Sequence, residues 1–244
     1  MNGNFMLEKS MQFSKRLEEK KKQIDSNFPW YPYGILNNFI HLQEIFNRRP
    51  MGDLVRSGQK ILDIGAADGD LSFFLESLGY ELDVIDNAPT NFNNLKGVRL
   101  LREWLDSKIG IYEIDIDNQF KTPDAQYDLI FFLGILYHIK NPYHVLESLS
   151  RISKHIIVST RIAKFTPDGT DISKSSLAYL LGPNESNNDS TNYWIFSDAG
   201  LRKIFDRCGW EVLEMLSVGD TKKSNPCDQN HDERAFALLR SRNN

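Results

Sequence analysis

Residues 60–71, with the sequence KILDIGAADGDL, constrain the fold more than any other segment of the chain. A short apolar run leads to Gly65 and Gly69, and a helical pattern follows directly. Glycine lets the backbone turn tightly and approach a ligand, and the N-terminus of a helix offers N–H groups to an acceptor. The segment therefore predicts a strand, a ligand-binding turn and a helix in succession, as at the start of an α/β fold.

The chain beyond residue 60 alternates between apolar runs and helical patterns, which predicts a doubly wound, mostly parallel sheet with helices on both faces. The expected helices span 71–78, 142–152 and 197–208, with Ser197 as the N-cap of the last. The alternation is interrupted by an insertion at about 162–195, after the fifth strand. Seven strands are expected, at residues 60–64, 82–85, 111–116, 129–133, 155–160, 211–216 and 234–240.

Residues 1–57 differ from the remainder and are expected to form an N-terminal helical and aromatic extension to a domain of residues 58–244. Helices are predicted at 11–24 and 37–47, and Pro29 and Pro32 exclude a regular helix between them. The aromatic residues of segment 28–33 either contact a substrate ring or pack the N-terminal helices onto the sheet. Residues 1–60 carry ten basic and six acidic side chains, a balance of +4.

The glycine-containing turn does not match two common phosphate-binding motifs. A dinucleotide site of the form G-x-G-x-x-G, counted from Gly65, would have glycines where this chain has Ala67 and Asp70. A carboxylate at residue 70 would repel a pyrophosphate, which disfavours a nicotinamide oxidoreductase. A P-loop is excluded because no Gly-Lys-Ser/Thr follows.

The pattern D-x-G-x-x-x-G, which begins at Asp63, resembles motif I of the class I S-adenosylmethionine-dependent methyltransferases. In that family the middle position, here Ala67, is usually glycine. The resemblance implies a Rossmann-like methyltransferase fold, S-adenosylmethionine as cofactor and S-adenosylhomocysteine as product. It also implies that residues 65–69 hold the methionine part of the cofactor and that Asp63 orients its amino group.

Three further segments match the family in the expected order, over roughly residues 58–160: the end of the second strand at Asp86, the third strand around Asp115, and residues 127–138, which resemble the fourth strand and the substrate-facing loop beyond it. Asp86 ends the second strand, where an acid can accept the ribose hydroxyls. Asp115 and Ile116 resemble the adenine-binding positions, with Asp117 as the alternative to Asp115 because strand register is uncertain by a residue or two. The cofactor contacts expected from the resemblance are Asp63, Gly65, Ala66, Ala67, Gly69, Asp86, Asn87, Asp115, Ile116 and Leu133.

The run LGILYHIKNP at residues 133–142 resembles a signature of the tRNA wobble-uridine carboxymethyltransferases and related methyltransferases. Residues 192–209 resemble the same group. The resemblance implies that Tyr137 helps to hold the extra carboxylate of carboxy-S-adenosylmethionine. Tyr137 and His138 are expected to face the acceptor, and His138 is either a general base or a residue that caps backbone groups.

These patterns predict a methyltransferase that acts on a hydroxyl or amine of a small molecule. The formal net charge of −4 favours this acceptor over tRNA, because nonspecific nucleic-acid binders are basic. A tRNA wobble-uridine (carboxy)methyltransferase and a non-catalytic cofactor-binding module are the alternatives.

Cys208 and Cys227 have no zinc-site spacing, so no metal is expected. No apolar run is long enough for a membrane span or a signal core, which predicts a cytoplasmic protein without a membrane partner. The oligomeric state is not indicated.

Overall fold

The computed structural model describes every residue except 57, 119 and 125. The chain divides into two compact units, Met1–Phe131 and Phe132–Asn244. The domain boundary expected at residue 57 falls on a residue outside the described part of the chain. Among the described residues, no helix is long and apolar enough to cross a membrane.

The first unit contains a parallel sheet with β1 (Lys60–Ile64) at its centre. On one side β1 pairs with β2 (Glu81–Asp86), which pairs with β3 (Gly110–Glu113). On the other side β1 pairs with β4 (Tyr127–Leu133), whose last two residues belong to the second unit. Four of the five residues of β1 are buried, as in a strand that is covered on both faces. The carboxyl ends of β1 and β2 thus lie side by side.

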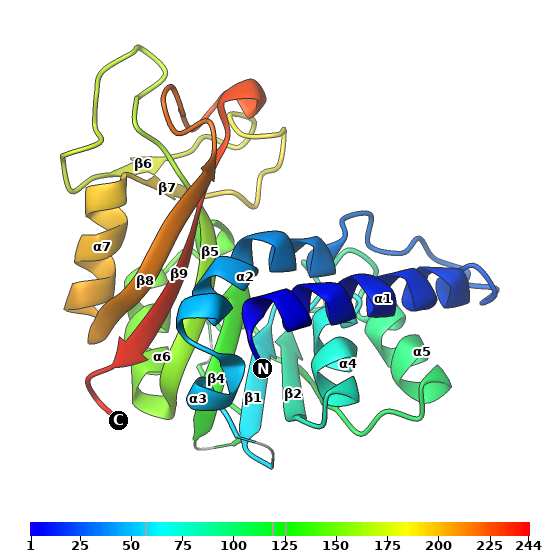
Figure 1. Ribbon diagram of the computed structural model, residues 1–244. Helices are drawn as coiled ribbons and strands as arrows, with labels where there is room; N and C mark the ends of the chain where they lie inside the picture. Colours follow the sequence, from blue (N-terminus) through cyan, green and yellow to red (C-terminus); the bar gives the residue numbers. More distant parts are fainter. Residues whose placement is uncertain (57, 119, 125) are drawn as a thin grey trace. The chain divides into compact units, whose positions relative to one another are not determined.

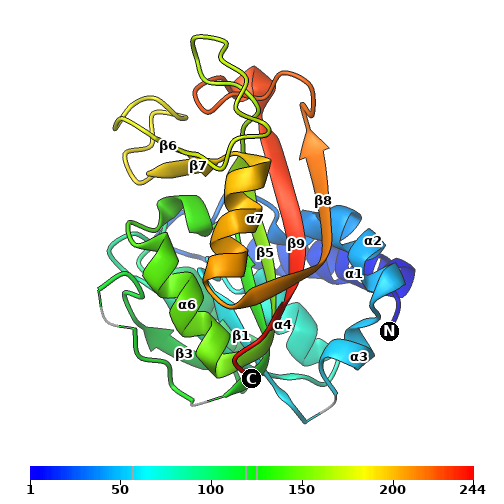
Figure 2. The same cartoon turned by 90° about the vertical axis from the view of Figure 1, so that its left-hand side faces the viewer.

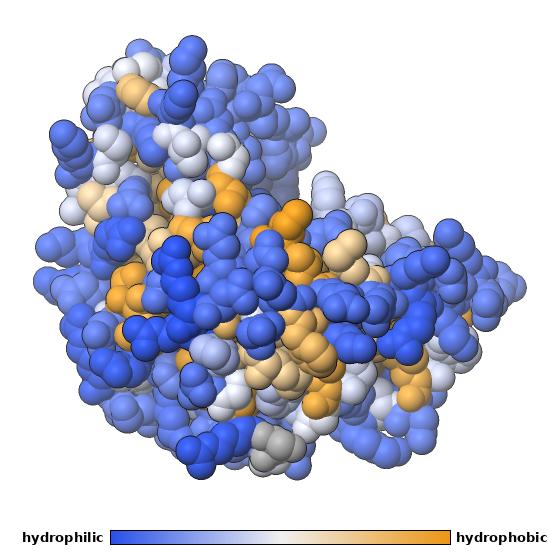
Figure 3. All heavy atoms as spheres, viewed as in Figure 1, coloured by the Kyte–Doolittle hydropathy of each residue, from blue (hydrophilic) through white to orange (hydrophobic). Residues whose placement is uncertain are grey.

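Helices of the first unit surround this sheet: α1 (Gly3–Lys21), η1 (Ile35–Asn38), α2 (Phe39–Arg48), α3 (Met51–Leu54), α4 (Asp70–Ser77) and α5 (Lys96–Trp104). Figure 1 shows α1, in dark blue, lying lengthwise beside α2. The rings of Phe13 and Phe39 pack on Phe74 of α4, with centroids 5.7 and 5.2 Å from its own. The surface over α1 is mainly hydrophilic (Figure 3), since only one stripe of this helix is buried.

The second unit is built on β5 (Ser153–Ile162), which pairs antiparallel with β9 (Glu233–Ser241) and parallel with β7 (Trp194–Phe196). Strand β9 also pairs with β8 (Trp210–Gly219), and β7 with β6 (Ala178–Leu180), both antiparallel. The remaining elements are η2 (Leu136–His138), α6 (Pro142–Ile152), α7 (Asp198–Arg207) and η3 (Gln229–His231). Figure 2 shows α6 and α7 beside the strands β5, β8 and β9.

The predicted α/β class is confirmed, and each of the seven expected strands is present. The described residues contain nine strands, because the insertion adds the three-residue strands β6 and β7. The side chain of Ser197 caps α7 by accepting the Gly200 N–H at 2.9 Å, as predicted.

Several boundaries differ from the prediction: the strands expected at 155–160 and 211–216 span 153–162 and 210–219, and two further differences concern the N-terminal helix and the third strand. The first helix spans residues 3–21 rather than 11–24. The strand expected at 111–116 ends at Glu113, so Asp115 lies beyond it. The cause is a turn in which the Asp115 carboxylate accepts the N–H of Asp117 at 3.0 Å, while its carbonyl accepts the N–H of Asn118 at 3.2 Å.

Candidate functional site

The turn between β1 and α4 has an unusual backbone, in which three residues adopt positive φ angles. Gly65 and Gly69 have φ of 73° and 84°, and Ala67, which carries a side chain, has φ of 53°. Such a conformation in a non-glycine residue is strained and persists only where its surroundings hold it. A Cβ atom at Gly69 would lie 2.8 Å from the ring of Phe73 and 2.8 Å from Val98. Ala66 and Ala67 are buried, so the turn is tightly packed against the sheet.

Asp86, at the end of β2, is bonded directly to this turn. Its Oδ2 accepts the Ala67 N–H at 3.1 Å and the Asn91 side-chain amide at 2.9 Å, and its Oδ1 accepts the Asn87 N–H at 2.8 Å. Burial raises the pKa of Asp86, and these three hydrogen bonds oppose the rise. A carboxylate offers about four acceptor positions, so the Asp86 side chain can brace the turn with three of them and still accept one more hydrogen bond. The contribution of Asn91 is not marked by any sequence motif.

Asp63, on β1, is buried and accepts a hydrogen bond of 2.7 Å from the Ser72 hydroxyl of α4. Burial raises its pKa to about 7, and the negative charge of Asp86 acts in the same direction. The Ser72 hydrogen bond opposes these effects. The Asp63 carboxyl group therefore exchanges its proton near neutral pH. A cation that approaches it would favour the ionised carboxylate.

The adenine-binding candidates follow β3. The backbone N–H of Ile114 donates to the carbonyl of Asp86 at 3.0 Å, which brings this segment to the end of β2. Asp115 is exposed and lines a cavity of about 350 Å³ together with Tyr112 and Lys121, whereas Ile116 is buried. The structure thus gathers Asp63, the turn, Asp86, Asn87 and the residues after β3 at one edge of the first unit's sheet.

A buried charge cluster lies next to the turn. The Lys21 ammonium group, at the end of α1, is 2.9 Å from Asp70 and 3.8 Å from Asp68. Both carboxylates are buried. Asp70 is the residue whose carboxylate argued against a pyrophosphate site in the sequence analysis. In the structure it forms an ion pair with Lys21, 49 positions earlier in the chain. Among the described residues, no cluster of three His, Cys, Asp or Glu side chains could hold a metal ion.

In the second unit, η2 carries Tyr137 and His138, and the half-buried Leu133 ends β4 just before it. The Nδ1 atom of His138 is 3.0 Å from both the carbonyl and the hydroxyl oxygen of Thr191. The Thr191 hydroxyl donates to Asp189 at 2.6 Å, so both Thr191 oxygens act as acceptors toward the ring. The His138 proton therefore lies on Nδ1, and Nε2 carries the lone pair.

Burial lowers the pKa of His138, and the positive charge of Arg234 lowers it further. The Thr191 carbonyl and the charge of Asp189 oppose this shift. The imidazole is consequently neutral at pH 7 and can accept a proton at Nε2. Thr191 and Asp189 belong to the insertion, and no local pattern connects them with His138, 53 residues earlier.

Arg234, at the start of β9, lies beside Tyr137. Its Nη1 atom is 3.5 Å from the Tyr137 hydroxyl, and the guanidinium carbon is 5.6 Å from the centre of the ring. The Tyr137 backbone carbonyl accepts the N–H of Tyr193 at 2.8 Å, which fixes η2 to the insertion. The sequence motifs did not indicate Arg234, which is 97 residues from Tyr137.

The chain matches a family model described as a methyltransferase domain over residues 17–215. It is 34% identical over 145 residues to a tRNA U34 carboxymethyltransferase of Campylobacter hominis, covering 54% of this chain and 48% of the relative. A protein of the same name from Aliarcobacter butzleri is 28% identical over 163 residues, covering 65% and 49%. The chain thus spans about half the length of these relatives.

Solved structures show the same fold at low sequence identity. The N-terminal domain of EvdMO1 with SAH bound has a TM-score of 0.57 at 17% identity, covering 93% of this chain and 97% of that domain. A putative sarcosine dimethylglycine methyltransferase from Galdieria sulphuraria has a TM-score of 0.59 at 15% identity, covering 82% and 84%. With the family model, the motif order and the geometry of the turn in agreement, the chain belongs to the class I S-adenosylmethionine-dependent methyltransferases.

Proposed function

We propose that the protein transfers the methyl group of S-adenosylmethionine to a hydroxyl or amine of a small molecule, with His138 as the general base. The observation that carries this proposal is the contact of the His138 Nδ1 atom with both Thr191 oxygens at 3.0 Å, which leaves the Nε2 lone pair to accept a proton, while burial lowers the pKa of the ring. A hydroxyl or ammonium acceptor must lose a proton during methylation, and a neutral imidazole can take it.

The residues of the first unit suit the cofactor. The turn at Gly65–Ala67–Gly69 has the small side chains that close approach of a ligand requires, and Asp63 supplies a carboxylate for its amino group. When bound, the cofactor supplies an electrophilic methyl group on a sulfonium whose leaving thioether needs no proton. The chain's own residues then orient the cofactor and exclude water. Within the first unit, we assign the cofactor to Asp63, Gly65, Ala66, Ala67, Gly69, Asp86, Asn87, Asp115 and Ile116.

A small acceptor is favoured by the charge of the chain, whose formal net charge is −4. A protein that neutralises several phosphates of a nucleic acid needs a cationic surface. Ten of the basic residues fall in positions 1–60, where six acidic residues oppose them.

Carboxymethyl transfer to the wobble uridine of tRNA is the second candidate, and the Tyr137–Arg234 pair supports it. A cofactor with an extra carboxylate needs a cationic hydrogen-bond donor, and a guanidinium group beside a phenol can supply a charged donor and a neutral one. Two relatives at 34% and 28% identity are tRNA U34 carboxymethyltransferases.

Calorimetric titration with S-adenosylmethionine and carboxy-S-adenosylmethionine separates the two candidates. Tighter binding of the first is expected, with an unchanged ratio of the two affinities in Arg234→Gln. A preference for the carboxylated cofactor of tenfold or more, lost in Arg234→Gln, would instead establish the second candidate. Binding of transfer RNA that falls steeply as salt rises would support it further.

The role of His138 as general base is tested with His138→Gln, assayed over pH 6–9 against a library of hydroxyl and amine acceptors. Unaltered turnover in this variant would dismiss the general-base role.

A further inference from the structure

We propose that residues 26–33, here called the strap, form one wall of the cofactor site, and that Asp68 is the positioning residue that holds the strap in place. This inference rests on the proposed cofactor site at the turn between β1 and α4. It adds the aromatic N-terminal segment to that site and gives a role to a carboxylate that the methyl-transfer mechanism does not use.

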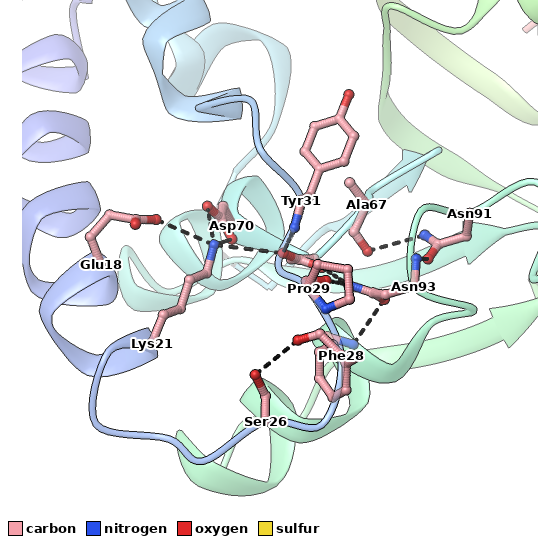
Figure 4. Close-up of polar contacts among 12 residues, drawn as sticks. Glu18, Lys21, Ser26, Phe28, Pro29, Tyr31, Ala67, Asp70, Asn91 and Asn93 are labelled. Carbon is pink, nitrogen blue, oxygen red and sulfur yellow. Dashed lines mark hydrogen bonds and ion pairs between the residues drawn. The ribbon is translucent and has the colours of Figure 1, made fainter. Parts of the chain in front are cut away.

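The strap is hydrogen-bonded to both loops that carry the cofactor candidates. The Tyr31 N–H donates to Oδ2 of Asp68, in the glycine turn, at 2.7 Å. Asn93, in the loop that follows Asp86, donates from Nδ2 to the Pro29 carbonyl at 3.3 Å and to Oδ1 of Asp68 at 2.7 Å. Figure 4 shows the strap and its hydrogen bonds to these two loops. Both oxygens of the Asp68 carboxylate thus join the strap to the turn.

The backbone around Asp68 is shaped for this carboxylate. A Cβ atom at Gly97, in the first turn of α5, would lie 2.1 Å from Oδ1 of Asp68, so only glycine leaves room for it. The Gly97 N–H donates to Oδ1 of Asn93 at 3.0 Å, which orients the amide of that side chain toward Asp68 and the strap. Asp68, Asn93 and Gly97 are therefore linked by hydrogen bonds and are all buried, so water does not compete for these bonds.

The charge of this region suits a cationic ligand. Asp68 and Asp70 are buried with one buried ammonium group, that of Lys21, between them. The Lys21 ammonium group also lies 3.4 Å from the carboxylate of the more exposed Glu18, so three carboxylates face one ammonium group before Asp63 and Asp86 are counted. A sulfonium cofactor with an ammonium group would be attracted to such a site, whereas a pyrophosphate would be repelled.

Aromatic contacts stiffen the strap. The Tyr31 ring meets Phe92 and Tyr33 edge-on, with centroids 5.9 and 5.4 Å apart. Trp30 packs against Phe28 at 5.2 Å. We expect a cofactor behind this wall to leave faster when the Asp68 and Asn93 bonds to the strap open. The strap should therefore slow cofactor dissociation.

The experiment compares Asp68→Asn with a matched control, Asp83→Asn. Asp83 is an equally buried carboxylate of the same unit, bonded to the Tyr127 hydroxyl at 2.8 Å and to Lys60 at 3.0 Å, away from the strap. In Asp68→Asn, Lys21 keeps its ion pair with Asp70. The new side-chain NH₂ group faces either the Tyr31 N–H or the Asn93 side-chain amide, and both of these are donors, so one hydrogen bond is lost. Asn93→Ala is the second variant, in case Asp68→Asn does not fold. Deuterium exchange of residues 26–34 and the dissociation rate of S-adenosylhomocysteine are measured for all four proteins.

We expect faster exchange of the strap and at least tenfold faster dissociation of S-adenosylhomocysteine in Asp68→Asn and Asn93→Ala. Asp83→Asn should match the wild type in both measurements. A freed strap with dissociation within twofold of the wild type would overturn the inference, and so would a strap that stays protected. If the wild-type protein does not bind S-adenosylhomocysteine, the cofactor proposal itself fails, which is a different outcome from either of these.

Discussion

Cofactor binding should be coupled to the ionisation of Asp63. The buried carboxyl group has a pKa raised to about 7, because it is removed from water and lies near the charge of Asp86. To accept the ammonium group of the cofactor it must be ionised. We therefore expect the affinity for S-adenosylhomocysteine to rise with pH up to about neutrality.

The magnitude follows from the fraction of ionised Asp63. With a pKa of about 7, this fraction is about 3% at pH 5.5 and about one half at pH 7.0. The apparent dissociation constant scales with the inverse of the competent fraction, so binding at pH 5.5 should be about fifteenfold weaker, or about 1.6 kcal/mol. At pH 6, binding should release about 0.9 proton for each cofactor bound.

Calorimetry at pH 5.5 and 7.0, in buffers of low and high ionisation enthalpy, measures both the affinity and the proton release. Asp63→Asn should bind more weakly at pH 7.0 and lose the pH dependence. A wild-type dissociation constant that changes less than twofold between these pH values would refute the reasoning, as would an unchanged slope in Asp63→Asn.

The stability of the cofactor-free protein should show the opposite trend. The folded-state pKa of Asp63, about 7, exceeds the unfolded value of about 3.9, so the folded state binds the additional proton between them. The stabilisation is fully present below pH 4 and is lost as pH rises to about 7, at most on the order of 4 kcal/mol. Urea denaturation of the wild type and Asp63→Asn at pH 4.5 and 7.5 measures this difference, and equal pH slopes would contradict it.

Three further substitutions test contacts within each of the two units. Lys21→Met should cost about 3–5 kcal/mol by leaving buried carboxylates unpaired; addition of Asp70→Asn should recover part of this loss in urea denaturation, and a cost below 1 kcal/mol would argue against a buried ion pair. Gly69→Ala should cost about 2–4 kcal/mol, because φ is 84° and the methyl group would meet a neighbouring ring at 2.8 Å; thermal melting at the wild-type temperature would contradict it. Ser197→Ala should cost about 1 kcal/mol by removing the α7 cap, and an unchanged denaturation midpoint would show that the cap is dispensable.

The elements that the sequence predicted are those with a strong local pattern. The strand at 60–64 and the helix at 142–152 have the expected bounds, because an apolar run before glycine and a proline at the first helical position are local features. Helix α5 was not expected: Leu95, at its N-cap position, has a positive φ and no side-chain capping bond. Strands β6 and β7 are three residues each, too short for a periodic pattern.

By itself, the sequence determined the order of strands and helices, the position of the glycine turn and the acidic ends of the strands. These depend on backbone sterics and on hydrophobic periodicity, which act over a few residues. Only the tertiary structure brought Lys21 to Asp70, Thr191 to His138 and Arg234 to Tyr137, over 49, 53 and 97 residues. Such pairs form because buried polar groups must find partners, and which partner is in reach depends on how distant segments pack.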